Sequence, residues 1–141
     1  MASQNTILLA DDSEDDEILL KRVLRLSGLA NPVILVRDGE EAIAYLRGDG
    51  LYGDRGKHPL PKVLMLDLKM PKKNGFEVLQ WVKAQPALRD MLVVVLTSSD
   101  RTEDVERSYQ MGANSFLSKP CRVEDVRNLA KGFPGFLDGT Q

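Results

Sequence analysis

Side chains that can act as acids, bases or metal ligands stand at the ends of three short runs of mostly apolar residues. Asp11 and Asp12 follow the run at 7–10, Asp67 follows the run at 63–66, and Lys119 follows the run at 115–118. Mg²⁺ takes oxygen ligands, usually one or two carboxylates together with waters and phosphate oxygens. The chain has one histidine and one cysteine, which leaves no cluster for zinc. The carboxylates therefore favour a magnesium site.

The same residues suit phosphoryl transfer. A carboxylate can act as the nucleophile and form an aspartyl phosphate, while a metal ion and a lysine neutralise charge on the phosphoryl oxygens. Asp67 is the best candidate nucleophile, because it ends the middle strand and leaves Asp11 and Asp12 as metal ligands. Thr97 could donate a hydrogen bond to a phosphoryl oxygen, and Lys119 would supply a fixed positive charge.

Each of these residues also has a purely structural interpretation. The acids at 14–17 most simply complement the positive end of a helix dipole, so we give them no catalytic role. Two adjacent acids before the N-cap, Asp11 and Asp12, are more than the helix dipole needs, so we favour metal binding for them. Taken alone, Thr97 would be an ordinary turn hydroxyl and Lys119 a solvated lysine. Their joint placement at strand ends argues for one site.

Five short aliphatic runs alternate with five amphipathic stretches of helical length, a pattern typical of a parallel sheet with helices on both faces. The expected strands are 6–10, 33–36, 63–67, 92–96 and 115–117. Their almost continuous hydrophobicity indicates burial on both faces. Right-handed crossovers bring the carboxyl ends of all strands to one edge. That edge would hold the acids, the threonine and the lysine together.

Capping residues mark the expected helix boundaries. Ser13, Asp38, Asn74 and Asp100 are the expected N-caps of the first four helices, and glycines at 28, 48, 112 and 132 the expected stops of the first, second, fourth and fifth. The expected inward residues are Leu19, Val23 and Leu26, then Phe76, Leu79 and Val82, then Val105 and Tyr109, and finally Val123, Val126, Leu129 and Ala130. The fourth helix has the thinnest apolar face, so we expect it to be the least firmly packed.

Composition narrows the class of protein. The 141 residues, 43% of them apolar, suit a single domain over 1–141. The formal charge is −2 and the basic residues are dispersed, which argues against a direct nucleic-acid partner. A single cysteine excludes an intramolecular disulfide. No apolar run approaches the roughly 20 residues that a membrane span needs. We expect a soluble cytoplasmic protein with no membrane partner.

Four motifs then occur in order along the chain. They are residues 7–13 (ILLADDS), residues 66–71 (LDLKMP) with Gly75, residues 95–98 (VLTS), and Gly112-Ala113 with residues 118–120 (SKP). Together they resemble the receiver domain of two-component response regulators, over essentially the whole chain. The resemblance implies a flavodoxin-like, doubly wound sheet of five parallel strands in the order 2-1-3-4-5 with five helices. It also implies a phosphorelay signalling protein, which promotes only its own phosphorylation and dephosphorylation, and not an enzyme.

The resemblance implies a role for each matching residue of the site. Asp67 would be the phosphoacceptor and would share Mg²⁺ with Asp11, Asp12 and the backbone carbonyl of Lys69. Lys119 would be the partner of the phosphoryl group. The sensor histidine kinase, or a phosphotransfer protein, would be the phosphodonor.

Further positions match the residues that respond to phosphorylation in members of the family. Thr97 would be the switch hydroxyl, and Phe116 stands where the family has its mobile switch aromatic. The bond between Lys119 and Pro120 would be cis. On the first helix, we expect exposed apolar side chains such as Leu20 and Leu24 to meet a helix of the kinase.

More narrowly, the chain resembles the stand-alone receivers that serve phytochrome-type histidine kinases. This likeness depends on the segment from Gly48 to Pro61, the stretch 92–100 and the aromatic tail at 133–136. Such receivers are often dimeric, so a homodimer is an expectation, although Phe133, Phe136 and Leu137 could equally fold back on their own domain. The Gly48 to Pro61 segment is long for a connection in this fold and is a candidate contact surface.

Other functions of such a fold meet specific objections. A haloacid-dehalogenase-type phosphatase needs a second acid two residues after its nucleophile, and Lys69 stands there. A flavodoxin-like electron carrier must bind a phosphate after the first strand, where the acids at 11–17 would repel it. The remaining alternative is a receiver-fold adaptor that acts by protein–protein interaction without phosphorylation. The intact acidic pair, Asp67, Thr97 and Lys119 weigh against it.

Overall fold

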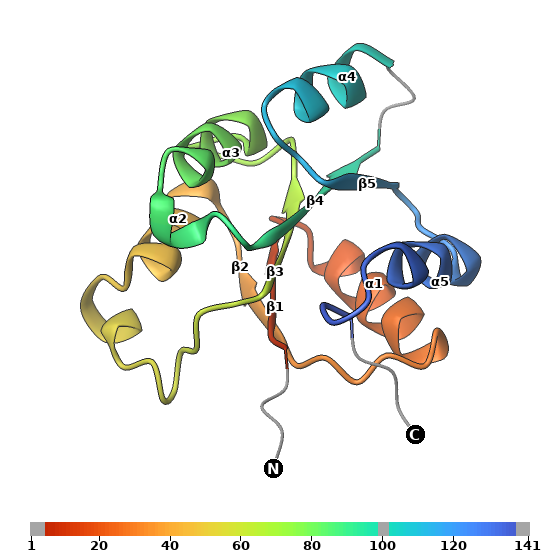
Figure 1. The fold of residues 1–141 in the computed structure, drawn as a ribbon, viewed down its shortest axis with the longest axis horizontal. Coiled ribbons are helices and arrows are strands. Elements are labelled where there is room, and N and C mark those ends of the chain that lie inside the picture. Colours follow the sequence, from red (N-terminus) through yellow and green to blue (C-terminus); the bar gives the residue numbers. More distant parts are fainter. Residues whose placement is uncertain (1–4, 99–101, 138–141) are drawn as a thin grey trace.

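A computed structural model describes residues 5–98 and 102–137 of the chain. Its sheet has five parallel strands in the order β2-β1-β3-β4-β5 (Figure 1). The strands are β1 (Ile7–Ala10), β2 (Val33–Val36), β3 (Val63–Asp67), β4 (Leu92–Thr97) and β5 (Ser115–Ser118). The predicted strands and strand order are confirmed, with β1 beginning at Ile7 and not at Thr6. β4 and β5 each run one residue further than predicted, because Thr97 pairs with Ser118 in the ladder.

A helix follows each strand, and the first four helices connect consecutive strands. The helices are α1 (Glu14–Leu26), α2 (Gly39–Arg47), α3 (Gly75–Lys83), α4 (Thr102–Gln110) and α5 (Val123–Gly132), with short 3₁₀ helices η1 (Gly50–Gly53) and η2 (Pro86–Leu88). The side chains of Ser13, Asp38 and Asn74 accept hydrogen bonds from the third residue of their helices, so these N-caps are confirmed. The expected N-cap Asp100 lies outside the described residues.

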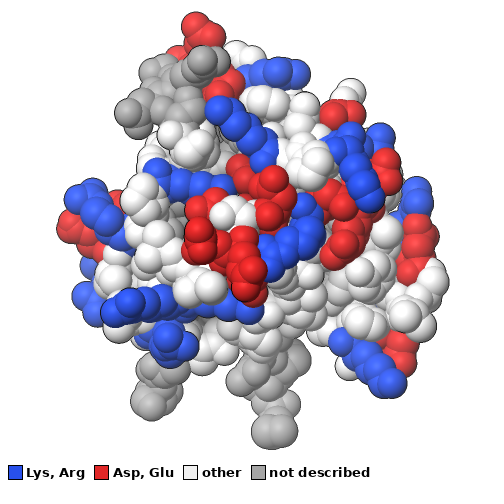
Figure 2. Space-filling model, turned by 180° about the vertical axis from the view of Figure 1, so that it is seen from behind, with Lys and Arg blue, Asp and Glu red and all other residues white. Residues whose placement is uncertain are grey.

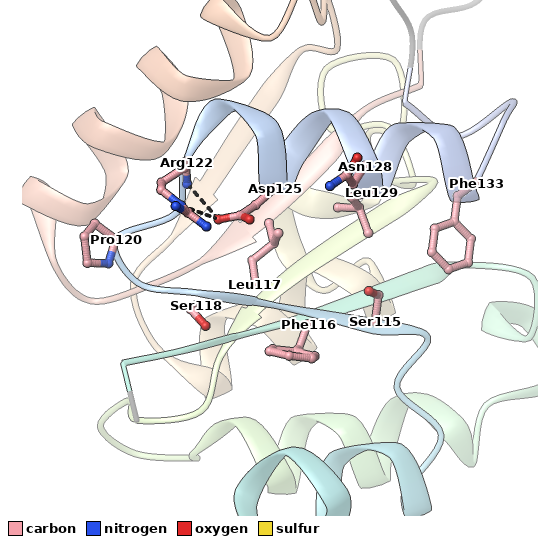
Figure 3. Close-up of a pocket in the computed structure, with 10 residues that line it drawn as sticks. All are labelled: Ser115, Phe116, Leu117, Ser118, Pro120, Arg122, Asp125, Asn128, Leu129 and Phe133. Atoms are coloured by element: carbon pink, nitrogen blue, oxygen red, sulfur yellow. Dashed lines mark hydrogen bonds and ion pairs between the residues drawn. The ribbon is translucent and has the colours of Figure 1, made fainter. Parts of the chain in front are cut away.

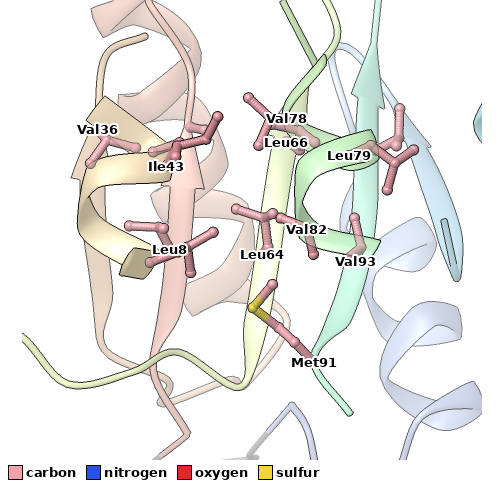
Figure 4. Close-up of a cluster of buried hydrophobic side chains, with 14 of the residues drawn as sticks. Leu8, Val36, Ile43, Leu64, Leu66, Val78, Leu79, Val82, Met91 and Val93 are labelled. Carbon is pink, nitrogen blue, oxygen red and sulfur yellow. The ribbon is translucent and has the colours of Figure 1, made fainter. Parts of the chain in front are cut away.

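The sheet separates two hydrophobic clusters. In Figure 1, α2 and α3 cover one face of the sheet, and α1 and α5 lie together on the other. Figure 4 shows the first cluster, where Val78, Leu79 and Val82 of α3 reach the strand residues Leu64 and Leu66. Every residue of β3 is buried. The middle strand is therefore a rigid support for the acid at its carboxyl end.

The rotation of α1 differs from the prediction. Leu20 and Leu24, expected to be exposed, are each only 5% exposed, whereas Leu19 is 40% and Leu26 is 55% exposed. Val23 is buried as predicted. Both leucine sets recur at helical spacing, so the sequence pattern allows either rotation. Packing of α1 against α5 and the sheet selects the face that carries Leu20 and Leu24.

The inward face of α4 differs from the prediction at Tyr109, whereas Val105 is partly buried. Tyr109 is 45% exposed, and among residues 103–110, whose burial is described, the buried one is Ser108, whose hydroxyl donates to the carbonyl of Asp104 at 2.8 Å. A cation–π contact links α4 to α3, with the guanidinium carbon of Arg107 4.1 Å from the ring centre of Phe76. A small residue at the inner position lets the helix approach the domain without a large apolar face.

The segment from Gly48 to Pro61 folds against the end of α2. Arg55 donates hydrogen bonds to the carbonyls of Tyr45 and Leu46, at 2.9 Å and 3.0 Å, and to that of His58 at 3.2 Å. The first two are carbonyls in the last turn of α2, where the helix supplies no i+4 donor, and that of Tyr45 also accepts from the N–H of Gly48 at 3.2 Å. The tip of the segment projects into solvent, since Leu51 is 85% exposed. The segment therefore caps a helix as well as forming surface.

The aromatic tail folds back on its own domain. Phe133 and Phe136 pack against the cluster that contains α1 and α5, and Leu137 is only 7% exposed. The side-chain amide of Asn31 donates to the carbonyl of Phe136 at 2.9 Å and to that of Asn5 at 2.8 Å. Within the described residues, no helix is long and apolar enough to cross a bilayer.

Candidate functional site

The carboxyl ends of four strands converge on one edge of the sheet. Asp67 ends β3, Thr97 ends β4, Asp11 directly follows β1, and Lys119 directly follows β5. Asp11 is 1%, Thr97 is 4% and Asp67 is 6% exposed, so these polar groups are almost fully removed from solvent. Buried ionisable groups need partners, because desolvation is costly.

Lys119 is the partner that these acids share. Its ammonium nitrogen lies 2.9 Å from an oxygen of Asp11, 2.9 Å from an oxygen of Asp67 and 2.8 Å from an oxygen of Asp16. An ammonium group has three N–H donors, so these contacts use all of them. The backbone N–H of Lys119 donates to the carbonyl of Thr97 at 2.8 Å. The bond from Lys119 to Pro120 is cis, as predicted.

Asp16 was not among the sequence candidates for the site. Its place in the first turn of α1 was attributed to the helix dipole, yet its carboxylate contacts Lys119. The N-cap Ser13 explains the placement, because its hydroxyl accepts from the N–H of Asp16 and its own N–H donates to Asp11 at 3.0 Å. These bonds hold the first turn of α1 at the strand-end edge, where the carboxylate of Asp16 meets Lys119. The N-cap Ser13, followed three residues later by Asp16, was the sequence signal that could have placed Asp16 at the site.

Three carboxylates are grouped closely enough to hold a cation. Oxygen atoms of Asp11, Asp12 and Asp67 all lie within 4.8 Å of one another. Asp12 is exposed while the other two are buried, so the group opens toward solvent. An oxygen-only donor set of this kind fits a hard divalent cation. The backbone N–H of Lys69 donates to Asp67 at 3.1 Å and fixes the orientation of that carboxylate.

An open cavity of about 490 Å³ gives access to the group. Its lining includes Asp12, Asp67, Lys69, Ser98 and Lys119. Figure 2 shows acidic side chains gathered near the middle of one face, with basic side chains around them. A phosphorylated donor can therefore reach Asp67 from outside, although the acids alone would repel its anionic group.

Burial and pairing shift the pKa values of the two central residues. Burial raises the pKa of Asp67 above that of a solvated aspartate, although the nearby Lys119 and the Lys69 N–H act in the opposite direction. Burial alone would lower the pKa of Lys119, but its carboxylate partners raise it well above the usual lysine value. Lys119 therefore remains charged at neutral pH, and Asp67 is more basic than a solvated aspartate.

Phe116 lies beside the site and outside it. The residue is 37% exposed on β5, and its ring meets that of Tyr109 edge-on at 6.2 Å between centres. Figure 3 shows Phe116 pointing away from α5, whereas Leu117 points toward it. A groove of about 450 Å³ runs between β5 and α5. The aromatic residue thus belongs to the contact between β5 and α4.

Comparisons with known proteins agree with this architecture. A model of the response regulator receiver domain matches residues 7–131. Response regulator Rcp1 of Synechocystis sp. is 38% identical over 130 residues, which covers 92% of this chain and 86% of that protein. The Mn²⁺-bound structure of Rcp1 has a TM-score of 0.75 and 38% identity, covering 94% of this chain and 93% of that one.

Two further solved structures are similar over most of their length. The bacteriophytochrome response regulator AtBRR has a TM-score of 0.82 and 41% identity, with 92% of each chain covered. The phosphorylated cyanobacterial phytochrome response regulator RcpA has a TM-score of 0.77 and 35% identity, covering 92% of this chain and 91% of that one. With the family model spanning almost all of the sheet and helices, the chain belongs to the response regulator receiver domain family.

Proposed function

We propose that this chain is a cytoplasmic phosphorelay protein that accepts a phosphoryl group on Asp67 from the phosphohistidine of a sensor histidine kinase. The supporting observation is the shared ion pairing of Lys119, which lies 2.9 Å from both Asp67 and Asp11. A charged lysine held beside a basic carboxylate, at the floor of an open cavity, provides a nucleophile and a neutralising group in one place.

In the transfer step, a carboxylate oxygen of Asp67 attacks the phosphorus atom. The new O–P bond forms as the N–P bond of phosphohistidine breaks, and the electron pair stays on the imidazole nitrogen. Lys119 passes an N–H donor from the Asp67 carboxylate to a phosphoryl oxygen, while the N–H of Lys69 keeps Asp67 oriented. Bound by Asp11, Asp12, Asp67 and the carbonyl of Lys69, Mg²⁺ would neutralise charge on the phosphoryl oxygens.

The kinase we propose is of the phytochrome type. Support comes from AtBRR and RcpA, which are described as phytochrome response regulators and are 41% and 35% identical to this chain. On the molecule itself, Ile18 and Leu19 of α1 are 59% and 40% exposed. They replace Leu20 and Leu24 as the apolar side chains that a kinase helix would cover.

Labelling with a phosphorylated histidine kinase, or with acetyl phosphate, tests this function. Wild-type protein should take up label only in the presence of Mg²⁺, because charge on the transferred group needs neutralisation. The variant Asp67→Asn should take up none, and adding a chelator should abolish labelling of the wild type. Labelling of Asp67→Asn at the wild-type level would show that another residue is the acceptor. No labelling of the wild type by any donor would favour an adaptor that works without phosphorylation.

A further inference from the structure

We propose that Asp16 is a positioning residue for phosphoryl transfer, which holds the ammonium group of Lys119 from the solvent side of the site. This inference rests on the function proposed for Asp67. The contact between Asp16 and Lys119 measures 2.8 Å, as short as any that Lys119 makes, and joins residues 103 positions apart in the chain.

Hydrogen bonds connect Asp16 to the rest of the site in a closed ring. Lys119 donates to Asp16 and pairs with Asp11, Asp11 accepts from the N–H of Ser13, and Ser13 accepts from the N–H of Asp16. The ring joins the start of α1 to the ends of β1 and β5. The bond to Ser13 fixes the backbone of Asp16 beside the site, while its carboxylate accepts from Lys119. A positioning residue must itself be fixed in this way.

The three acids around Lys119 lie at different depths. The side chain of Asp16 is 36% exposed, compared with 8% for Asp67 and 1% for Asp11. Asp16 also lines the open cavity that leads to Asp67. It thus holds the ammonium group from the solvent side, while the other two acids hold it from below.

The outer contact matters because the charge to be neutralised moves outward during the reaction. The phosphoryl oxygens on Asp67 would lie further into the cavity than the carboxylate oxygen that Lys119 now contacts. Lys119 must pass one N–H to them while its other two N–H groups remain bonded to Asp11 and Asp16. Without Asp16, only the two buried acids would hold the ammonium group, and its head would settle toward them and away from the incoming group.

Asp15 offers a matched control on the same turn of α1. It is exposed and has no side-chain partner among residues 5–98 and 102–137. Replacing Asp15 or Asp16 removes the same charge from the same end of the helix dipole. Only the replacement of Asp16 removes a hydrogen bond to Lys119. Any difference between the two variants therefore reports the contact itself.

The experiment measures the rate of phosphorylation by acetyl phosphate at saturating Mg²⁺. We expect Asp16→Ala to react about fivefold to tenfold more slowly than Asp15→Ala, the size expected for one partly exposed hydrogen bond between charged groups. Asp16→Asn keeps an acceptor oxygen and should recover most of the lost rate. Binding of Mn²⁺, followed by electron paramagnetic resonance, should be within about threefold in Asp16→Ala and Asp15→Ala, since Asp16 is outside the metal-holding group.

Different outcomes separate this inference from the proposed function. Wild-type protein that takes no label would overturn both. Wild type that is labelled at Asp67, with Asp16→Ala equally fast, would overturn only the role of Asp16. Equal slowing in Asp15→Ala and Asp16→Ala would make the effect one of net charge, and an Asp16→Asn variant as slow as Asp16→Ala would rule out positioning. Loss of Mn²⁺ binding in Asp16→Ala would show a structural role instead.

Discussion

Gly39 is the first residue of α2 and lies against the loop that follows β3. A Cβ atom at this position would lie 2.0 Å from the carbonyl oxygen of Lys73 and 2.6 Å from its Cβ. Both distances are far below van der Waals contact, and the first involves backbone, which cannot rotate away. The loop connects Asp67, at the end of β3, to α3 and contains Lys69. The missing side chain of Gly39 therefore sets how closely α2 approaches the loop of the candidate site.

Gly39→Ala should force this loop to move. We expect a loss of about 1–3 kcal/mol in the free energy of unfolding, the usual cost of overpacking, together with weaker divalent-metal binding because Lys69 moves with the loop. Urea denaturation and Mn²⁺ titration measure the two effects. The matched control is Gly132→Ala in α5, where a Cβ would meet nothing within 4 Å. It should be neutral or stabilising by up to about 1 kcal/mol. Similar stability in both variants would refute the steric explanation.

The elements most able to respond to phosphorylation are α4 and β5. β5 is an edge strand, and Phe116 on it meets Tyr109 of α4 at 6.2 Å between ring centres. The buried Thr97 ends the neighbouring strand and pairs with Ser118. We propose that a phosphoryl group on Asp67 draws the hydroxyl of Thr97 inward and that Phe116 moves with it. Such a change would shift α4 and β5 between two packings.

Thr97→Ala should uncouple this response from the chemistry. We expect acetyl phosphate to label the variant at close to the wild-type level, because Asp67 and Lys119 are intact. The phosphorylation-dependent change in hydrogen exchange over residues 102–118 should shrink at least about threefold, since the missing hydroxyl can no longer bond the phosphoryl group. Thr97→Ser keeps the hydroxyl and should restore the change. An undiminished change in Thr97→Ala would place the switch elsewhere.

At the scale of the whole molecule, two exposed apolar side chains are candidates for contact with a kinase. Ile18, 59% exposed, lies on α1, which starts at the strand-end edge that holds the site. Leu51 of η1, 85% exposed, lies in the segment between the end of α2 and the start of β3, at the opposite edge of the sheet. Arg55 fastens the segment beneath Leu51 to the end of α2. Shortening this segment would therefore remove a helix cap as well as a surface. Single substitutions at exposed positions test recognition more cleanly.

Ile18→Ser should slow transfer from the cognate kinase while leaving phosphorylation by acetyl phosphate unchanged. A kinase must cover the strand-end edge to bring its phosphohistidine in line with Asp67, whereas a small donor needs only the chemical site. We expect roughly tenfold slower transfer, in line with the loss of one apolar contact in an interface. Leu51→Ser, measured in the same way, shows whether the Gly48 to Pro61 segment adds specificity. Equal slowing with both donors would indicate damage to the site.

Much of the fold follows from local sequence. The aliphatic run at 63–66 predicts a strand buried on both faces, and every residue of β3 is buried. Ser13, Asp38 and Asn74 predict helix starts, because a cap hydrogen bond involves residues only three apart. The sheet order follows from the family motifs. Because strand ends in a parallel sheet share one edge, the sequence also predicts that Asp11, Asp67 and Lys119 should meet.

Tertiary structure decided what local pattern leaves open. Leu19, Leu20, Leu24 and Leu26 are all apolar, so the rotation of α1 depended on packing against α5 and the sheet. The contact of Asp16 with Lys119 depends on where a helix start and a strand end come together, and 103 positions separate them. An acid in the first turn of a helix satisfies the dipole whether or not it meets a lysine. Sequence therefore determines which groups stand at the edge of the sheet, and only packing decides which of them touch.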